Sequence, residues 1–348
     1  MTMADITLNI DGRSVTVPAG TTILDAARTV GVAIPVLCHH PKLSVTGACR
    51  VCIVEVGGEP VASCSTAVEE GMEVTTASPY IEGLRRDIVD LILSDHPYDC
   101  MVCERAGDCE LQELAYKYQI RKPVFHGERR VYPKRDNNPF IERDMEKCIL
   151  CGRCVKVCWE VQGVGAIDYA YKGFATKICP PFERDLDCEF CGQCVSVCPT
   201  GALVSKPSLC KGRTRDVRQV ETVCPYCGCG CNITYDTVKN EVIRAGSRPA
   251  TLNDGWLCVK GKFGFSFLNS PERLATPLLR KDGALVKASW DEALDAIAAK
   301  FKSIRSAQGP DAIGGLSSAR CTNEENYLFQ KFMRAAVGTN NVDHCARL

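Results

Sequence analysis

Residues 148–158 read CILCGRCVKVC, and residues 188–198 repeat the same cysteine spacing as CEFCGQCVSVC. In each run three cysteines are separated by two residues, and a fourth follows after three more. Identical spacing at two places indicates an internal duplication. Cysteines grouped this tightly are typical of metal coordination rather than of a scattered disulfide framework. The two runs therefore predict a duplicated metal-binding domain.

This spacing is the one found around four-iron clusters in two-cluster ferredoxins. There the first three cysteines of a run bind one cluster, and the fourth crosses to the other. A zinc site fits the pattern poorly, although Trp159 rather than proline follows the first run and weakens the match slightly. The predicted ligand sets are Cys148, Cys151, Cys154 and Cys198 for one cluster and Cys188, Cys191, Cys194 and Cys158 for its neighbour.

Three further groups have the spacing of metal ligands, and each supplies four side chains. The first suits a two-iron cluster, with a four-cysteine zinc site as its alternative. The second contains a histidine, whose neutral imidazole would leave a four-iron cluster less negative and raise its reduction potential. The groups are Cys38, Cys49, Cys52 and Cys64; His96, Cys100, Cys103 and Cys109; and Cys224, Cys227, Cys231 and Cys258.

These five groups contain twenty predicted ligands, nineteen of which are cysteines. His39 and His40 adjoin Cys38, but four cysteines already complete that site, so both are interpreted as bystanders. The alternative for His96 is an ordinary loop residue before Pro97. The thiols left without a predicted cluster are Cys179, Cys210, Cys229, Cys321 and Cys345.

Composition narrows the function classes further. The 348 residues include 42 Lys and Arg against 42 Asp and Glu, which removes the bulk attraction to nucleic acids or anionic membranes. No apolar stretch approaches the roughly 20 residues of a membrane-spanning helix, so direct membrane contact is not expected. The beginning of the chain has no signal-peptide or twin-arginine pattern. Together with 24 cysteines, this predicts a cytoplasmic protein in a reducing compartment.

Periodicity and capping residues predict several secondary-structure elements. Alternating residues around Asp11-Gly12 predict a hairpin over 6–17. The basic residues of 121–135 predict a solvated connector, with a partner-docking strip as the alternative. A buried strand is expected over 312–316. Helices are expected after the N-cap residues Thr22, Ser78, Ser289 and Thr322.

Several of these motifs resemble known families. The Cys38 group follows a ββα start and resembles the two-iron ferredoxin domain of complex I, iron-only hydrogenases and NAD-linked formate dehydrogenases, which implies a β-grasp fold. The His96 group occurs in the same families. Residues 258–261 (CVKG), 276–278 (TPL) and 289–293 (SWDEA) resemble molybdenum and tungsten bis-pterin oxidoreductases. That resemblance implies that Lys260 lies between cluster and pterin, with an ordinary surface lysine as the alternative.

The resulting fold class is a multidomain α+β protein. We expect a two-iron β-grasp ferredoxin domain, a four-iron segment with one histidine and three cysteine ligands, a two-cluster bacterial ferredoxin domain, a four-iron domain and the start of an α/β molybdopterin oxidoreductase domain. The corresponding residues are 1–78, 79–120, 141–210, 220–275 and 276–348, with linkers at 121–140 and 211–219.

Three functions fit this organisation. The first is the electron-relay part of a formate dehydrogenase catalytic subunit, which converts formate to CO2 at a molybdenum or tungsten bis(pterin guanine dinucleotide). The second is the large iron–sulfur subunit of complex I, and the third is a freestanding multi-cluster carrier. Iron-only hydrogenase is excluded because the chain continues into the Cys224 group. Residues 317–327 and 341–348 resemble formate dehydrogenase and favour the first.

The resemblance also implies electron partners and a missing metal ligand. The partner is expected to be a flavin-containing, NAD-reducing subunit, or else a ferredoxin or hydrogenase subunit. In formate dehydrogenases the motif resembling residues 343–348 is followed by a catalytic cysteine or selenocysteine, here at position 349. We therefore expect a UGA codon for selenocysteine at that position. The 348 residues alone would transfer electrons without formate dehydrogenase activity.

Overall fold

The computed structural model describes residues 4–133 and 137–345. The chain divides into two units, Met1–Arg218 and Gln219–Leu348. Each unit is described separately below. Within the described residues no helix combines the length and the apolar character needed to cross a membrane.

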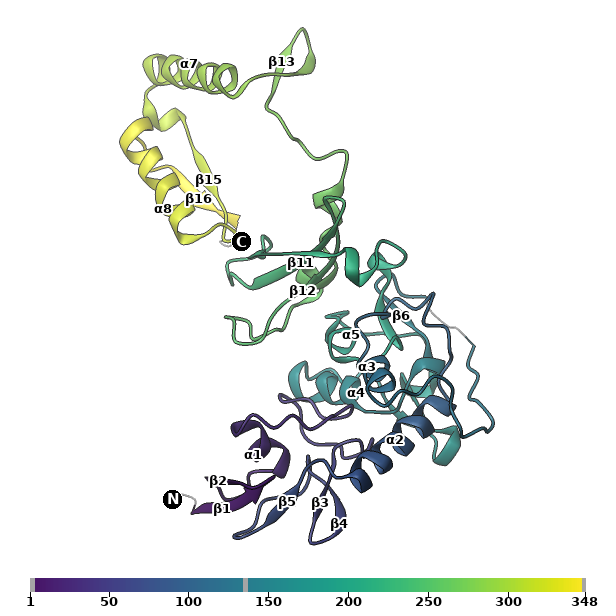
Figure 1. The fold of residues 1–348 in the computed structure, drawn as a ribbon. Helices are drawn as coiled ribbons and strands as arrows, with labels where there is room; N and C mark the ends of the chain where they lie inside the picture. Colours follow the sequence, from purple (N-terminus) through teal and green to yellow (C-terminus); the bar gives the residue numbers. More distant parts are fainter. Residues whose placement is uncertain (1–3, 134–136, 346–348) are drawn as a thin grey trace. The chain divides into compact units, whose positions relative to one another are not determined.

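The first unit begins with a mixed five-stranded sheet and one short helix (Figure 1). The strand order is β2-β1-β5-β3-β4, in which β1 and β5 are parallel and the other neighbours are antiparallel. This is the β-grasp arrangement that the resemblance implies. The elements are β1 (Asp5–Ile10), β2 (Arg13–Pro18), α1 (Ile23–Thr29), β3 (Ile53–Val56), β4 (Glu59–Ala62) and β5 (Glu73–Thr75).

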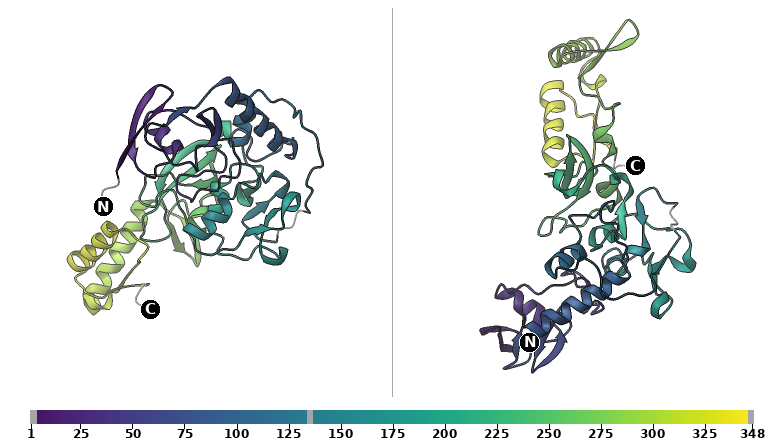
Figure 2. Two further views of the ribbon diagram at one scale, coloured as in Figure 1. Left: turned by 90° about the horizontal axis from the view of Figure 1, so that it is seen from below. Right: turned by 45° about the vertical axis from the view of Figure 1, so that its right-hand side comes forward.

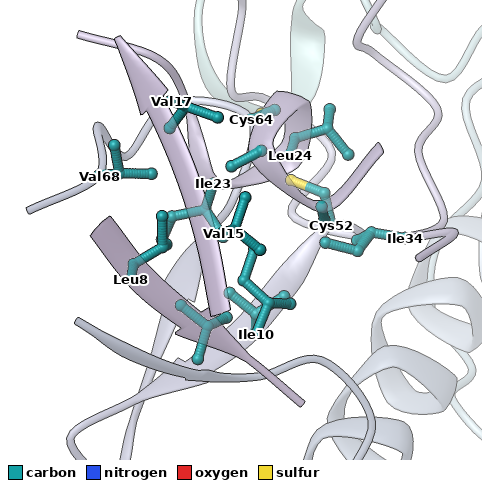
Figure 3. Close-up of a cluster of buried hydrophobic side chains, with 14 of the residues drawn as sticks. Leu8, Ile10, Val15, Val17, Ile23, Leu24, Ile34, Cys52, Cys64 and Val68 are labelled. Carbon is teal, nitrogen blue, oxygen red and sulfur yellow. The ribbon is translucent and has the colours of Figure 1, made fainter. Parts of the chain in front are cut away.

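The core of this domain lies between α1 and the sheet. Ile10, Ile23 and Leu24 are almost completely buried there. Figure 3 shows Cys52 and Cys64 beside Leu24, among the same buried side chains. The hydrophobic core therefore includes two predicted ligands, and burial of apolar surface fixes the segments before β3 and after β4 that carry them.

Two helices follow the sheet. α2 (Pro79–Ser94) begins after the N-cap Ser78, whose hydroxyl accepts from the backbone N–H of Ile81, and it lies beside β3 and α3 (Glu110–Lys117) (Figures 1 and 2). The guanidinium of Arg85 is buried and donates through Nε and Nη2 to the carbonyl of Ile53, at 3.1 and 2.6 Å. These bonds tie α2 to β3.

The duplicated cysteine runs form two short helical segments with small antiparallel ladders around them. β6 pairs with β9, and β7 pairs with β8. The α4 segment continues as a π-helical turn that contains Cys158. The bounds are β6 (Ile141–Arg143), α4 (Arg153–Lys156), the π turn (Val157–Val161), β7 (Asp168–Ala170), β8 (Lys177–Cys179), α5 (Gln193–Val197) and β9 (Leu203–Ser205).

The second unit contains a three-stranded sheet of order β10-β11-β12, a β13-β14 hairpin and a parallel β15-β16 pair. Its helices α7 and α8 begin with complete capping boxes at Ser289 and Thr322. The bounds are β10 (Arg218–Val223), β11 (Asn232–Val238), β12 (Glu241–Gly246), α6 (Val259–Phe263), β13 (Leu278–Lys281), β14 (Ala284–Lys287), α7 (Trp290–Gln308), β15 (Gly315–Ser317), α8 (Asn323–Phe332) and β16 (Val342–His344).

The structure confirms the predicted hairpin and the four capped helices. The prediction of a buried strand over 312–316 is wrong in its bounds, because Pro310–Ala312 forms a 3-10 turn and β15 starts at Gly315. Leu316 is 83% exposed. An apolar run followed by a polar segment gives no periodicity that would fix where so short a strand begins.

Candidate iron–sulfur sites

Two cavities lie within the duplicated domain, and their linings are the two exchanged cysteine sets. The lining of one includes Cys148, Cys151, Cys154 and Cys198. The lining of the other includes Cys158, Cys188, Cys191 and Cys194. The fourth cysteine of each run thus faces the cavity of the other run, as the ferredoxin spacing predicts.

Burial opposes free thiolates in the first cavity. It raises the pKa of Cys148 to about 11, and it raises the pKa of Cys154 well above the ordinary value. A buried thiolate is stabilised when a cation binds it, and metal binding then releases the thiol proton. Four thiols around one cavity therefore fit the ligand set that a four-iron cluster requires.

Within residues 4–133 and 137–345, no three His, Cys, Asp or Glu side chains meet closely enough to hold a single metal ion. The ligands of an iron–sulfur cluster are separated by the iron and sulfide atoms that lie between them. Each set needs only to surround a common space, as the two cavity linings do.

The Cys38 group lies in the loop between α1 and β3 and just after β4. The backbone N–H of Cys38 donates to Sγ of Cys49 at 3.4 Å, and the thiols of Cys49 and Cys64 lower the pKa of Cys38 by hydrogen bonding to its thiolate. The thiol of Cys64 likewise lowers the pKa of Cys52 to about 6. All four thiols therefore belong to one connected group at the core edge.

The two neighbouring imidazoles have partners within the protein. Nδ1 of His39 lies 3.4 Å from Nη2 of Arg28, and Nδ1 of His40 accepts from the backbone N–H of Lys42 at 3.3 Å. Their interpretation as bystanders stays a prediction.

The His96 group follows the end of α2. Burial is the main reason that the pKa of His96 falls to about 4, so its imidazole is neutral at physiological pH. Its Nδ1 is buried and has no hydrogen-bond partner among the described residues. Cys103 and Cys109 are buried, and Cys100 is exposed. A neutral, half-buried imidazole is the form that can ligate a metal.

The segment 198–201 connects the His96 group with the first ferredoxin cavity. The carbonyl of Cys198 accepts from Nη2 of Arg105 at 3.3 Å, and the carbonyl of Pro199 accepts from the backbone N–H of Glu110 at 3.0 Å. Gly201 lies so close to Cys103 that a Cβ placed on it would be 2.6 Å from Sγ. The absence of a side chain at Gly201 therefore permits two predicted cluster sites to approach each other.

We expect Gly201→Ala to lower the occupancy of the His96 cluster, because the added methyl group must displace the Cys103 thiol. Iron analysis and low-temperature electron paramagnetic resonance of the purified protein would measure this. Gly83→Ala is the matched control, since a Cβ at that exposed position of α2 meets nothing within 4 Å and improves helix propensity by up to about 1 kcal/mol. Wild-type iron content and spectra in the Gly201 variant would contradict the expectation.

Lys147 and Arg130 also lie between the segments that carry the His96 group and the first ferredoxin cavity. Nζ of Lys147 forms ion pairs with Asp99 at 2.8 Å and Asp144 at 3.1 Å. Burial alone would lower the pKa of Lys147, yet these two carboxylates raise it above its ordinary value. Arg130 pairs with Asp95 and donates from Nη2 to the carbonyl of Cys148 at 3.3 Å. The expectation of a solvated connector over 121–135 is therefore wrong for Arg130.

The Cys224 group lies in the second unit. Cys224 follows β10 and donates its N–H to the carbonyl of Cys231 at 2.8 Å, and Cys258 is the N-cap of α6. Hydrogen bonds from the backbone N–H and thiol of Cys229 lower the pKa of Cys227, and the charge of Lys260 contributes in the same direction. Lys260 is exposed on α6, near the predicted ligands. Its role towards a pterin stays a prediction.

Five family descriptions match successive parts of the chain. They are the 2Fe-2S iron-sulfur cluster binding domain at 3–79, the NADH-ubiquinone oxidoreductase-G iron-sulfur binding region at 85–123, the ferredoxin-like domain of NADH-quinone oxidoreductase subunit 3 at 138–204, the molybdopterin oxidoreductase Fe4S4 domain at 217–270 and molybdopterin oxidoreductase at 273–348.

Three relatives match nearly the whole of this chain. The chain is 44% identical over 345 residues to the NADPH-Fe(3+) oxidoreductase subunit alpha of Geobacter sulfurreducens, covering 99% of this chain and 40% of the relative. It is 40% identical to the G 2 subunit of NADH-quinone oxidoreductase from Rhizobium meliloti, covering 98% and 40%. It is 31% identical to a Staphylococcus aureus protein provisionally named formate dehydrogenase, covering 98% and 39%.

The chain carries the iron–sulfur and molybdopterin oxidoreductase region that these subunits share. This shared region spans about two fifths of the length of the three relatives. A crystal structure of NAD+-reducing [NiFe]-hydrogenase also contains a chain similar to it, with 30% identity, a TM-score of 0.57 and coverage of 60% of this chain and 91% of that one. By the family descriptions that match it, the shared region contains both 2Fe-2S and 4Fe-4S binding domains.

Proposed function

We propose that this region is the electron relay of a formate dehydrogenase catalytic subunit. The observation that carries the relay is the pair of cavities lined by exchanged cysteine sets. Each cysteine run supplies side chains to both cavities, which keeps the two sites close together. A short distance between clusters favours rapid electron transfer. The resemblance of residues 317–327 and 341–348 to formate dehydrogenase supports the substrate, together with the S. aureus relative.

Oxidation of formate to CO2 releases two electrons and one proton. The chain would hold one [2Fe-2S] and four [4Fe-4S] clusters, which supply one-electron transfer when bound. The subunit would also hold a molybdenum or tungsten bis(pterin guanine dinucleotide), with Lys260 between it and the Cys224 group. The partner would be a flavin-containing NAD-reducing subunit, or a ferredoxin or hydrogenase subunit. The hydrogenase chain of similar fold supports a multisubunit assembly.

The relative at 44% identity favours a second candidate, in which NADPH supplies the electrons and ferric iron is the final acceptor. The relative at 40% identity favours a complex I-like role in the same way. All of these candidates use the same chain of clusters, and they differ in the electron donor that reduces it.

The full-length subunit with its partner subunits can distinguish them. Anaerobic addition of formate should bleach the visible absorption of the clusters if formate is the donor. Bleaching by NADPH or NADH, with no response to formate, would instead support a nicotinamide donor and overturn the formate assignment.

We expect about 18 irons per chain after anaerobic purification, from one two-iron and four four-iron clusters. Iron, sulfide and zinc analysis would measure this. A fully occupied preparation with about 10 irons or fewer and stoichiometric zinc would contradict the five-cluster proposal.

A further inference from the structure

Arg153 occupies an unusual place for a charged side chain. It lies inside the first cysteine run, between Gly152 and Cys154, and is only 5% exposed. Burying a guanidinium carries a large desolvation cost unless it is paired and hydrogen-bonded. A buried arginine at this position therefore requires a partner, and the structure provides one.

That partner is Glu110, the first residue of α3. Nη1 and Nη2 of Arg153 donate to its two carboxylate oxygens at 2.6 and 2.8 Å, a bidentate arrangement. Glu110 follows Cys109 of the His96 group, and its backbone N–H donates to the carbonyl of Pro199, next to Cys198. The ion pair thus joins two segments that carry predicted ligands of different clusters.

One nitrogen of the guanidinium is left without a partner by this arrangement. Nε of Arg153 is buried and has no hydrogen-bond partner among the described residues. Arg153 interacts electrostatically with Cys151 and Cys198, both in the lining of the first cavity. It also interacts with His39 and His40, which follow Cys38 of the two-iron group. One cation therefore acts on ligand segments of three predicted sites.

The internal repeat shows that the motif does not itself require an arginine. Gln193 occupies the equivalent position of the second run, between Gly192 and Cys194, and is also buried, at 3% exposure. The two halves of the duplication differ here by one positive charge. A role in folding common to both runs would not explain this difference.

We propose that Arg153, held in place by Glu110, is a positioning residue that raises the reduction potential of the cluster bound by Cys148, Cys151, Cys154 and Cys198. A nearby positive charge stabilises the reduced, more negative state of a cluster, and hydrogen bonding to its sulfur atoms acts in the same direction. The duplicated cysteine runs thereby form two sites of unequal potential. This inference rests on the ligand set given under the proposed function.

The test is a redox titration of the full-length, cluster-loaded protein, followed by electron paramagnetic resonance. Arg153→Gln, which copies the second run, should lower the potential of this cluster. Glu110→Gln should raise it, because the arginine charge is then no longer compensated. At a fixed applied potential we expect the reduced-to-oxidised ratio to change about tenfold in each case, equivalent to about 59 mV for one electron. Lys156→Gln removes an equal charge from the same helix and should leave the potential unchanged.

Opposite shifts would support the proposal, since a purely structural ion pair would give the same defect whichever partner is removed. Shifts of the same sign, or shifts no larger than that of Lys156→Gln, would overturn it. Should Arg153→Gln lose iron, Glu110→Gln decides alone, with an upward shift in support and no shift against. Absence of four-iron signals in the unaltered protein would instead contradict the proposed function.

Discussion

Cys198→Ala is expected to lose one four-iron cluster, with about four fewer irons per chain than the unaltered protein. Cys198 is 8% exposed and faces the cavity formed by three cysteines of the other run. With three thiolates left, one iron of the cluster lacks its protein ligand. Iron analysis and electron paramagnetic resonance would measure the loss. Cys179→Ala is the matched control, because Cys179 lies between the runs and lines neither cavity.

Double variants separate the exchanged assignment from a direct one. If Cys198 and Cys148 serve one cluster, removing both should cost no more iron than removing either alone. Cys198→Ala combined with Cys188→Ala should empty both sites, with about eight irons lost. The opposite pattern would show that each run binds its own cluster and would refute the exchange.

His96→Cys is expected to retain its cluster at a lower reduction potential. A thiolate adds a negative charge where the neutral imidazole has none, and this disfavours the reduced state. The pKa of His96 is lowered to about 4, so the unaltered imidazole is neutral at neutral pH. The substitution therefore changes the charge at this ligand position from zero to minus one. A redox titration with electron paramagnetic resonance would measure the shift.

His126→Cys is the control for this substitution, because His126 is exposed in the connector and belongs to no predicted ligand set. It should change neither iron content nor potential. An unchanged potential and spectrum in His96→Cys itself would exclude His96 as a ligand.

The cysteine groups could be predicted from the sequence because their chemistry is encoded in local spacing. The crossing of Cys158 and Cys198 follows from the ferredoxin pattern, and the structure places each in the corresponding cavity. The capped helices were also predictable, since Ser289 and Thr322 each precede a glutamate at the third helical position. Ligation itself stays a prediction for all five groups.

The residues between the sites could not be predicted in the same way. Arg153 and Glu110 are 43 positions apart in the chain, and only the folded structure shows that they form an ion pair. Gly201 resembles any loop glycine until Cys103 is seen beside it. Arg130 looked like one of many solvated basic residues, yet it bonds to the carbonyl of Cys148. The charge of Arg153 within a cysteine run did not single it out either, because Lys156 and Glu189 also lie in the runs.

The exchange of the fourth cysteines also affects how the protein is assembled and damaged. Neither run can complete its own cavity, and the ladders beside them, β6-β9 and β7-β8, are only three residues long. Ladders this short contribute little stability by themselves. Under the proposed exchange, a run that is released when one cluster is lost also carries ligands of the other cluster, so we expect the remaining cluster to become more labile. The arrangement that brings the two sites together thereby links the stability of each cluster to the presence of the other.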